Sequence, residues 1–362
     1  MKTEGGVTLL ADPDSETQGR PPAARRGRWV LRALTGQRAG LAVVVVVLII
    51  VFGTLRPTFY DSRLVVFPLL RDVATLTVVG LAQLAVLSIG HMNLAVGRMA
   101  AFGAMVAGFS YQVLGLGLVS GLVLGLLAGA AVGALAGVII TSTGVNSFVV
   151  TLGLDFALLG LVTLVYGQFT TLAAFTVKPP GMEALRSYSL GDLCIGDLCG
   201  SPAVPQLLLL TVVALAGVGF LFARARTGRE MLLTGSNATA AELSGIPTKR
   251  RVIGAHTLSG LLSGLAGFML AVTAGSFTAG IGSAFLIPSF LGPVLGGTAL
   301  TGGAVSVIGT FMGISLTQVI QQGLSMLGVG LESLNIYLGL ILLVALSAVR
   351  IRQLFTRRRR SS

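Results

Sequence analysis

The side chains of this chain that could do chemistry are few, and they lie within or beside long apolar stretches. Asp155 is the acidic residue deepest inside an apolar segment, and His91, Asn93 and Asn146 flank glycine-rich breaks. Ionisable groups are costly in a membrane, so they are kept there mainly for function. We therefore expect these four side chains to line a pathway for a polar solute, with Asp155 accepting hydrogen bonds from a polyol. The alternatives are a structural pairing of Asp155 with Arg98 or His91, and helix-end roles for the other three.

The sequence lacks the motifs of several common hydrolases. A Walker A loop needs Gly-Lys followed by Ser or Thr, but none of the three lysines (Lys2, Lys178 and Lys249) follows a glycine. Neither a His-Glu-x-x-His metalloprotease motif nor a Gly-x-Ser-x-Gly nucleophile elbow is present. We expect no enzyme activity, no metal site and no bound cofactor in this chain.

The composition indicates that lipid surrounds most of the chain. Of 362 residues, 54% are hydrophobic and 10% are charged, and the mean hydropathy is +0.90. Soluble domains carry about 25% charged residues. A membrane-spanning helix needs roughly 20 apolar residues, which leaves room for about ten spans. The predicted fold class is an all-α, polytopic transmembrane helix bundle.

Ten apolar segments form this predicted bundle. The second, third and eighth contain Gly or Pro and are the candidates for broken or re-entrant helices. The segments are Ala39–Leu55, Leu64–Ile89, Ala95–Leu114, Gly115–Ile140, Ser147–Phe169, Val204–Ala223, Val252–Gly275, Phe285–Ala299, Ala304–Leu327 and Leu334–Val349.

The formal net charge of +12 is concentrated in three clusters. Of 25 Lys and Arg residues, seven precede Leu41, six lie between Arg224 and Arg251, and six follow Val349. With ten spans, all three clusters fall on one side of the membrane, which the positive-inside rule makes the cytoplasm. The clusters are not interleaved with aromatic residues, which argues against nucleic-acid binding.

This charge pattern divides the chain into a membrane domain and two tails. Residues 1–38 are predicted to form a disordered, basic cytoplasmic tail, residues 39–349 the transmembrane domain, and residues 350–362 a basic tail bound to anionic lipid headgroups. Residues 170–203 then form an extracytoplasmic loop and residues 224–251 a cytoplasmic loop. We expect a multi-pass protein of the cell (inner or plasma) membrane with both termini in the cytoplasm.

Two further patterns concern packing and cross-linking. The fourth apolar segment carries a glycine every four residues, which favours tight helix packing, with a sliding surface as the alternative. Cys194 and Cys199 lie in the predicted extracytoplasmic loop, where either a short disulfide or two free thiols fits the spacing. The glycines are Gly117, Gly121, Gly125, Gly129, Gly133 and Gly137.

The predicted cytoplasmic loop contains a short capped helix. Ser236 or Asn237 can cap its N-terminus, Gly245 can end it, and Pro247 prevents its continuation. A helix of two turns is too short to be stable alone. Because Glu242 disfavours insertion into lipid, we expect this helix to dock on a protein partner.

Four stretches, in order along the chain, resemble the ribose/xylose-type permease subunits of ABC importers. The ordered set spans about residues 90 to 310 and is more specific than any single glycine-rich match. The stretches are Gly90-His-Met-Asn-Leu-Ala-Val-Gly97, Asn146-Ser-Phe-Val-Val-Thr-Leu-Gly153, Gly235-Ser-Asn-Ala-Thr-Ala-Ala-Glu-Leu-Ser-Gly-Ile246, and Leu295-Gly-Gly-Thr-Ala-Leu-Thr-Gly-Gly303 with Gly309-Thr310.

This resemblance implies a permease for a pentose or hexose. It implies a homodimer or pseudo-dimer that works with an extracytoplasmic solute-binding protein and a cytoplasmic ATPase, which binds the ATP and Mg²⁺. The short helix would then transmit closure of the ATPase to the spans. The residues implied in this coupling are Asn237, Ala240, Ala241, Glu242, Leu243, Ser244 and Gly245.

The chain departs from the family pattern in its first stretch. Asn93 stands where that family has Asp, and Ala95 stands where it has Ser. Branched-chain amino-acid permeases, relatives in the wider superfamily, carry a similar Asn-containing sequence. A permease for branched-chain amino acids or nucleosides therefore stays open, as does an ion-coupled secondary transporter. A channel or structural membrane protein would not need the capped loop.

Overall fold

The computed structural model describes residues 37–330 apart from 172, 190–191, 193, 196–197 and 200–203, together with 333, 336–337, 339–340 and 343. The predicted N-terminal tail (except 37–38), the C-terminal tail and most of the tenth apolar segment lie outside the described residues. Their assignments stay predictions.

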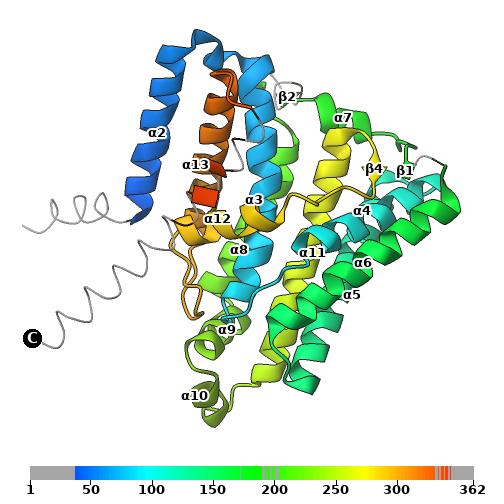
Figure 1. Ribbon diagram of the computed structural model, residues 1–362, viewed down its shortest axis with the longest axis vertical. Helices are drawn as coiled ribbons and strands as arrows, with labels where there is room; N and C mark the ends of the chain where they lie inside the picture. Colours follow the sequence, from blue (N-terminus) through cyan, green and yellow to red (C-terminus); the bar gives the residue numbers. More distant parts are fainter. Residues whose placement is uncertain are drawn as a thin grey trace, which may run out of the picture.

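The described chain folds into a bundle of helices whose long members run roughly along one axis (Figure 1). Within the described residues, the strands are two residues long and form two pairs, β1 with β4 and β2 with β3. The strands are β1 (Ala174–Phe175), β2 (Cys194–Ile195), β3 (Leu198–Cys199) and β4 (Phe277–Thr278). Two short helical turns, η1 (Pro57–Tyr60) and η2 (Ser62–Val66), precede α3. The α-helices are α2 (Gln37–Leu55), α3 (Phe67–Leu87), α4 (Val96–Gln112), α5 (Leu118–Thr143), α6 (Ser147–Phe169), α7 (Met182–Ser187), α8 (Leu207–Ala223), α9 (Arg226–Ser236), α10 (Ala238–Leu243), α11 (Thr248–Ala274), α12 (Leu286–Leu295) and α13 (Val307–Met326).

Each of the first nine predicted apolar segments contains a helix, which confirms a polytopic helix bundle. The exact number of spans stays a prediction. Among the described residues, four helices are long and apolar enough to cross a membrane, or up to five if α8 and α9, bent by 68°, form one span. Two further apolar helices, Gly40–Leu55 and Leu286–Leu295, are shorter.

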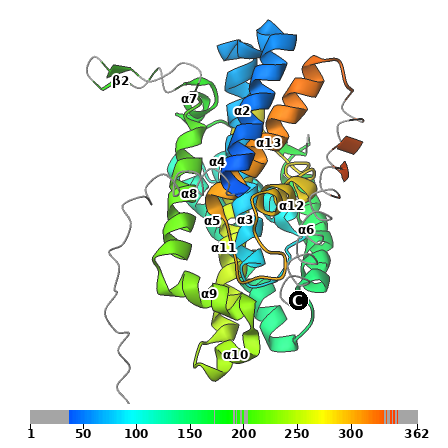
Figure 2. The ribbon, with the colours of Figure 1, turned by 90° about the vertical axis from the view of Figure 1, so that its left-hand side faces the viewer.

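The three segments singled out as broken or re-entrant differ from one another. The second is a continuous helix from Ser62 to Leu87, and the third begins only at Val96, after a break. The eighth is α12, whose 10 residues cover about half of a ~30 Å hydrocarbon core at about 1.5 Å per residue. Figures 1 and 2 show α12 near the middle of the long axis. Helix α12 is therefore too short to cross the membrane by itself, which agrees with the prediction of a broken or re-entrant eighth segment.

Helix α11 lies at the centre of the bundle, packed against α3, α4 and α5. The glycines of α5 explain the close contact with α11: a Cβ at Gly129 would collide with Gly260 O, and one at Gly133 with His256 O. Gly117 meets nothing within 4 Å and Gly121 meets Tyr111 of α4, so the close contact with α11 runs from Gly125 to Gly137. The predicted tight packing is confirmed.

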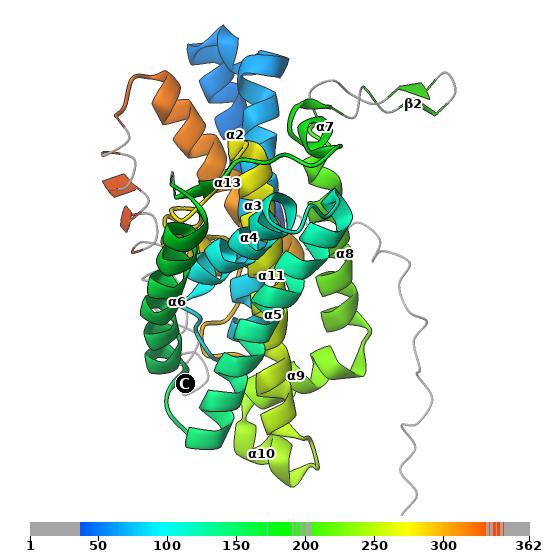
Figure 3. The ribbon, with the colours of Figure 1, turned by 90° about the vertical axis from the view of Figure 1, so that its right-hand side faces the viewer.

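The two ends of the bundle carry different elements. Helices α9 and α10 lie at one end in all three views, whereas α7 and the paired strands β1 and β4 lie toward the other (Figures 1, 2 and 3).

Strands β2 and β3 pair with Cys194 opposite Cys199 in the backbone register. The cysteine side chains lie outside the described residues, so the disulfide stays a prediction.

Candidate translocation and coupling site

The chain between α3 and α4, residues 88–95, is not helical, and it lies inside the bundle. Its centre is Asn93, which is fully buried. The side-chain Nδ2 of Asn93 donates to Ser259 Oγ at 3.0 Å, and its side-chain Oδ1 accepts from the backbone N–H of Ala95 at 3.0 Å. Gln83, with its amide oriented to suit both groups, bonds the backbone oxygen of Asn93 at 2.9 Å and its N–H at 3.3 Å. This network satisfies the polar groups at a buried break between two helices.

Two hydroxyl groups of α6 complete this network. Ser147 Oγ accepts from the N–H of Met92 at 3.3 Å, and Thr151 Oγ1 accepts from the N–H of Leu94 at 3.1 Å. These bonds replace the helical partners that residues 92 and 94 lack. The second resemblance stretch therefore packs directly on the first.

A pair of histidines flanks the same segment. His91 Nδ1 and His256 Nε2 lie 3.3 Å apart, with His91 half-buried and His256 fully buried. His256 belongs to α11, as does Ser259, so α11 holds both His91 and Asn93 from one side. The two histidines, distant in sequence, are brought together only by the fold.

Residues 88–90, 235–236 and 301–303 meet backbone to backbone, and we call this contact the glycine junction. The N–H of Gly303 donates to Ser88 O at 3.0 Å. A Cβ at Gly235, the penultimate residue of α9, would collide with Ser88 O and with Gly303 N. Gly90 and Gly302 both have positive φ, 74° and 87°, which favours glycine. The third and fourth resemblance stretches therefore also reach residues 88–95.

Helix α9 is held to α11 by an ion-pair cluster around a buried carboxylate. Glu230 Oε1 lies 2.6 Å from Arg226 Nε, and Glu230 Oε2 lies 2.6 Å from Arg251 Nε. The hydrogen bond from Arg226, followed by the charge of Arg251, lowers the pKa of Glu230 from its ordinary value of 4.5. Glu230 was not singled out from the sequence, because its partner Arg251 is 21 residues away in a different helix.

The short helix α10 is capped as predicted. Asn237 Oδ1 accepts from the N–H of Ala240 at 3.0 Å, and Gly245 has φ +77° beyond its end. Ser244 Oγ donates to Ala240 O at 2.8 Å, and Thr248 Oγ1 donates to Glu242 Oε1 at 2.6 Å. The helix is therefore stiffened at both ends.

The faces of α10 separate the predicted coupling residues into two groups. Ala241 is buried, with 4% of its surface exposed, and so supports the helix from within. Leu243 is 87% exposed, and Ala240 and Glu242 are also exposed. Leu243 is therefore a large apolar side chain left uncovered at this end of the bundle.

Asp155 forms an ion pair with Arg98, one of the two partners suggested from the sequence. The distance from Asp155 Oδ1 to Arg98 Nε is 3.7 Å. Asn146 lies apart from this pair: it is exposed and caps α6 by accepting from the N–H of Phe148 at 2.9 Å. Of the four predicted pathway residues, His91 and Asn93 lie together in the buried segment between α3 and α4. Asp155 lies about two turns after Ser147 on α6, and Asn146 is at the N-terminal end of that helix.

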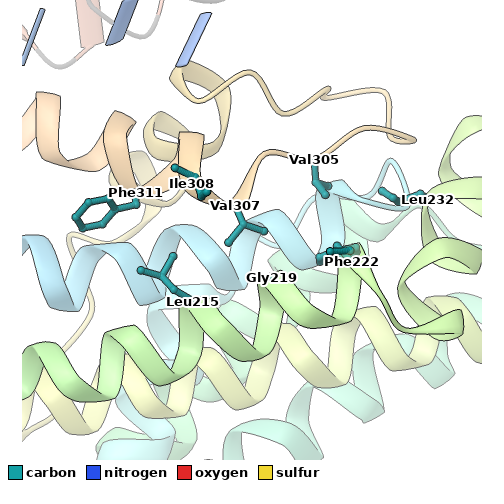
Figure 4. Close-up of a pocket in the computed structure, with 9 residues that line it drawn as sticks. Leu215, Gly219, Phe222, Leu232, Val305, Val307, Ile308 and Phe311 are labelled. Atoms are coloured by element: carbon teal, nitrogen blue, oxygen red, sulfur yellow. The ribbon is translucent and has the colours of Figure 1, made fainter. Parts of the chain in front are cut away.

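An apolar groove of about 450 Å³ runs between α8 and α13 (Figure 4). Its described lining offers no polar side chain, so it does not suit a hydrogen-bonding solute. Its lining residues are Leu215, Gly219, Phe222, Ala223, Leu232, Val305, Val307, Ile308 and Phe311.

Comparison with known proteins gives consistent matches along most of the chain. Residues 65–346 match a family described as branched-chain amino acid transport system / permease component. The chain is 36% identical over 309 residues to the probable ABC transporter permease protein YphD of Escherichia coli K12, covering 85% of this chain and 88% of that protein. It is 30% identical over 317 residues to the autoinducer 2 import system permease protein LsrD of Photorhabdus laumondii, covering 86% and 91%. No solved structure matches.

Proposed function

This chain belongs to the permease component family of ABC importers, and from that premise we propose that it forms the translocation pathway for a sugar of the pentose or hexose type. As a permease component it is a transport subunit and not an enzyme. Membership in an ABC family also removes the ion-coupled secondary transporter and the channel from the alternatives.

The observation that carries the proposal is the meeting of all four resemblance stretches around residues 88–95. Residues 90–97 form the segment itself, and Ser147 and Thr151 of α6 bond its backbone. Gly235 and Gly303 contact it at Ser88. Stretches that resemble a sugar permease in sequence thus form one connected site, as a shared role requires.

The coupling step of the proposal runs through α10. A cytoplasmic ATPase, which holds the ATP and Mg²⁺, docks on the exposed face around Leu243. Movement of α10 is passed to α9 through Asn237, which is both the C-cap of α9 and the N-cap of α10. Because Gly235 touches Ser88 and Gly303 without any intervening side chain, α9 cannot move far without displacing residues 88–90.

The proposed partners follow from the family membership, the uncovered surface of α6 and the distribution of basic residues. The described part of α6 leaves much of its apolar surface uncovered, as expected of a helix that faces lipid or a second permease. We expect a homodimer or pseudo-dimer, an extracytoplasmic solute-binding protein on the side of α7, and the three basic clusters in the cytoplasm. Both termini would then be cytoplasmic.

A branched-chain amino acid is the second candidate solute, because the matching family carries that description. The resemblance of residues 235–246 and 295–303 to ribose/xylose-type permeases favours a sugar. Relatives named for autoinducer 2 import add that molecule to the solutes worth testing. Nucleosides complete the set.

The test of coupling is affinity purification of the chain from its native membranes, with detection of the co-purified ATPase. Wild type is compared with Leu243→Asp, and with Leu116→Asp as a control near the opposite end of the bundle. A hot-spot contact is worth about 2 kcal/mol, or an affinity loss of about 30-fold. We expect Leu243→Asp to lose the ATPase and Leu116→Asp to retain it.

The test of the solute uses the purified complex in liposomes with its binding protein. Uptake of labelled pentoses, hexoses, autoinducer 2, nucleosides and branched-chain amino acids is measured with and without ATP. ATP-dependent uptake of a sugar is the expected result. A complex that takes up only leucine or isoleucine would overturn the sugar assignment and leave the ABC permease reading intact.

A further inference from the structure

The Arg98–Asp155 ion pair lies at a small pocket of about 130 Å³ between α4, α6 and the approach to α12. A water molecule occupies roughly 30 Å³ of liquid volume, so the pocket holds the equivalent of about four waters. That is room for one edge of a small solute. Its lining residues are Leu94, Gly97, Arg98, Leu152, Asp155, Gly282, Ser283 and Leu286.

The charges of this pair cannot face lipid. Asp155 lies about 12 Å along α6 from Ser147, at about 1.5 Å per residue, inside one of the helices long and apolar enough to cross a membrane. The side chains of Arg98 and Asp155 are 20% and 26% exposed within this chain. Charged groups inside membrane proteins almost always face the protein interior or a water-filled cavity. The exposed edge of the pair therefore opens toward water or toward another protein surface.

The backbone around the pocket connects it to the non-helical segment of residues 88–95. Leu94, on one wall, belongs to the non-helical segment and is bonded through its N–H to Thr151 Oγ1. Gly97 and Gly282 form another wall by direct backbone contact, since a Cβ on either would collide with the other's carbonyl oxygen. Gly282 has φ +77°. A displacement of residues 88–95 would therefore change the shape of this pocket.

The geometry of the pair suits a hydroxyl group. The distance from Arg98 Nε to Asp155 Oδ1 is 3.7 Å, which exceeds the ~2.7–2.9 Å of a charge-assisted hydrogen bond. The two charged groups therefore attract each other without a short hydrogen bond between these atoms. A guanidinium only donates and an ionised carboxylate only accepts. Neighbouring hydroxyls of a polyol can do both, and so can satisfy Arg98 and Asp155 together. The pair carries no net charge, which suits a neutral solute.

We propose that Arg98 and Asp155, with Ser283 at the pocket's exposed rim, form a contact site for the hydroxyl groups of the solute as it crosses the membrane. This inference rests on the proposed function and adds to it a specific pair of residues and a ligand chemistry. A clamp between α4 and α6, and an interface with a second permease, are the competing roles for the same pair.

Water access is tested by cysteine labelling. Ser283→Cys and the control Val213→Cys, on the exposed apolar face of α8, are treated with a membrane-impermeant thiol reagent in the assembled complex in liposomes, from both sides. The parent chain, which keeps Cys194 and Cys199, sets the background. We expect Ser283→Cys to be labelled above background from at least one side and protected by saturating solute with its binding protein. Val213→Cys should stay at background.

Ligand chemistry is tested with two paired replacements that leave no buried charge unpaired. Arg98→Gln with Asp155→Asn keeps donors and acceptors, whereas Arg98→Met with Asp155→Leu removes them. The readouts are thermal stability of the complex, and solute taken up per ATP hydrolysed at saturating loaded binding protein. We expect both double variants to fold, the polar pair to stay within about threefold of wild type, and the apolar pair to lose at least tenfold in uptake per ATP.

The outcomes separate the roles. Normal uptake per ATP in the apolar pair, or an unlabelled Ser283→Cys, would overturn the inference while leaving the permease function standing, since the wild-type complex would still import. Loss of uptake in both pairs would show that the charges themselves are required, and would overturn the assignment to neutral hydroxyl groups. Loss of stability in the polar pair, with normal uptake by the folded fraction, would identify a structural clamp.

Discussion

The seam between α5 and α11 and the glycine junction are both built from glycines in backbone contact, yet they are organised differently. In the seam, glycines recur every four residues along α5 and meet Gly260 and Gly264 of one partner helix. In the junction, three segments far apart in the chain meet without any period, and three of the glycines (Gly90, Gly302 and Gly303) have positive φ. The seam joins two rigid helices along their length, whereas the junction joins a helix end to two loops.

This difference teaches where the bundle is fixed and where it can transmit motion. A periodic seam resists sliding because every turn of one helix is in contact with the other. A single contact between a helix end and loops can move as a unit. We therefore expect substitutions in the seam to cost stability and those in the junction to cost coupling.

The largest effect is expected for Gly129→Val in the seam. The added side chain would collide with the backbone of Gly260, and overpacking costs about 1–3 kcal/mol. We expect a lower folded yield and a lower unfolding temperature in detergent, measured by size-exclusion chromatography after heating, with unchanged uptake per ATP in the folded fraction. Gly217→Val on α8, where a Cβ meets nothing within 4 Å, is the control. Equal stability of the two variants would contradict the comparison.

An effect of the same order is expected for Asn93→Leu, which breaks the network beside the junction. It leaves the hydroxyl of Ser259 and the backbone N–H of Ala95 without their present side-chain partner, at a cost of about 1–3 kcal/mol. Unfolding temperature and uptake should both fall. Asn93→Asp retains an oxygen for the N–H of Ala95 and should lose less of both. If the two variants behave alike, the side-chain bonds of Asn93 are not what holds residues 88–95.

Gly235→Ala should separate coupling from stability. Its Cβ would collide with Ser88 O and Gly303 N, so the end of α9 must shift away from the junction. We expect a stability loss of about 1 kcal/mol or less, because a helix end can yield. Uptake per ATP should fall about tenfold, which corresponds to about 1.4 kcal/mol of coupling free energy. The ATPase should still co-purify. A variant with normal uptake per ATP would show that the junction transmits nothing.

The smallest effect is expected at Glu230, which ties α9 to α11. Its pKa is lower in the folded protein than the ordinary 4.5, so the ion pairs add stability above that value and lose it as pH falls through the folded pKa. Wild type should therefore be more stable than Glu230→Gln at neutral pH. The difference in unfolding temperature should shrink as pH is lowered below about 4.5. A difference that does not change with pH would mean that packing, not charge, accounts for the effect.

Features that depend on local sequence were predictable. Asn237 and Gly245 capped α10 as their types indicated, because capping involves only neighbouring backbone groups. The glycine period of α5 predicted tight packing. The number of spans depends on more than local sequence, since apolarity gives the length of a segment but not whether a short helix such as α12 crosses the membrane or stops half-way.

The sequence by itself determined that this chain is a helical membrane permease, because hydropathy, helix caps and the order of family motifs are written along the chain. Only the tertiary structure decided which residues share a site. The pairing of His91 with His256, of Arg98 with Asp155 and of Gly235 with Gly303 joins positions that are separated by 57 residues or more. Such contacts depend on how whole helices cross, and crossing geometry is set by the sum of many packing contacts rather than by any local pattern.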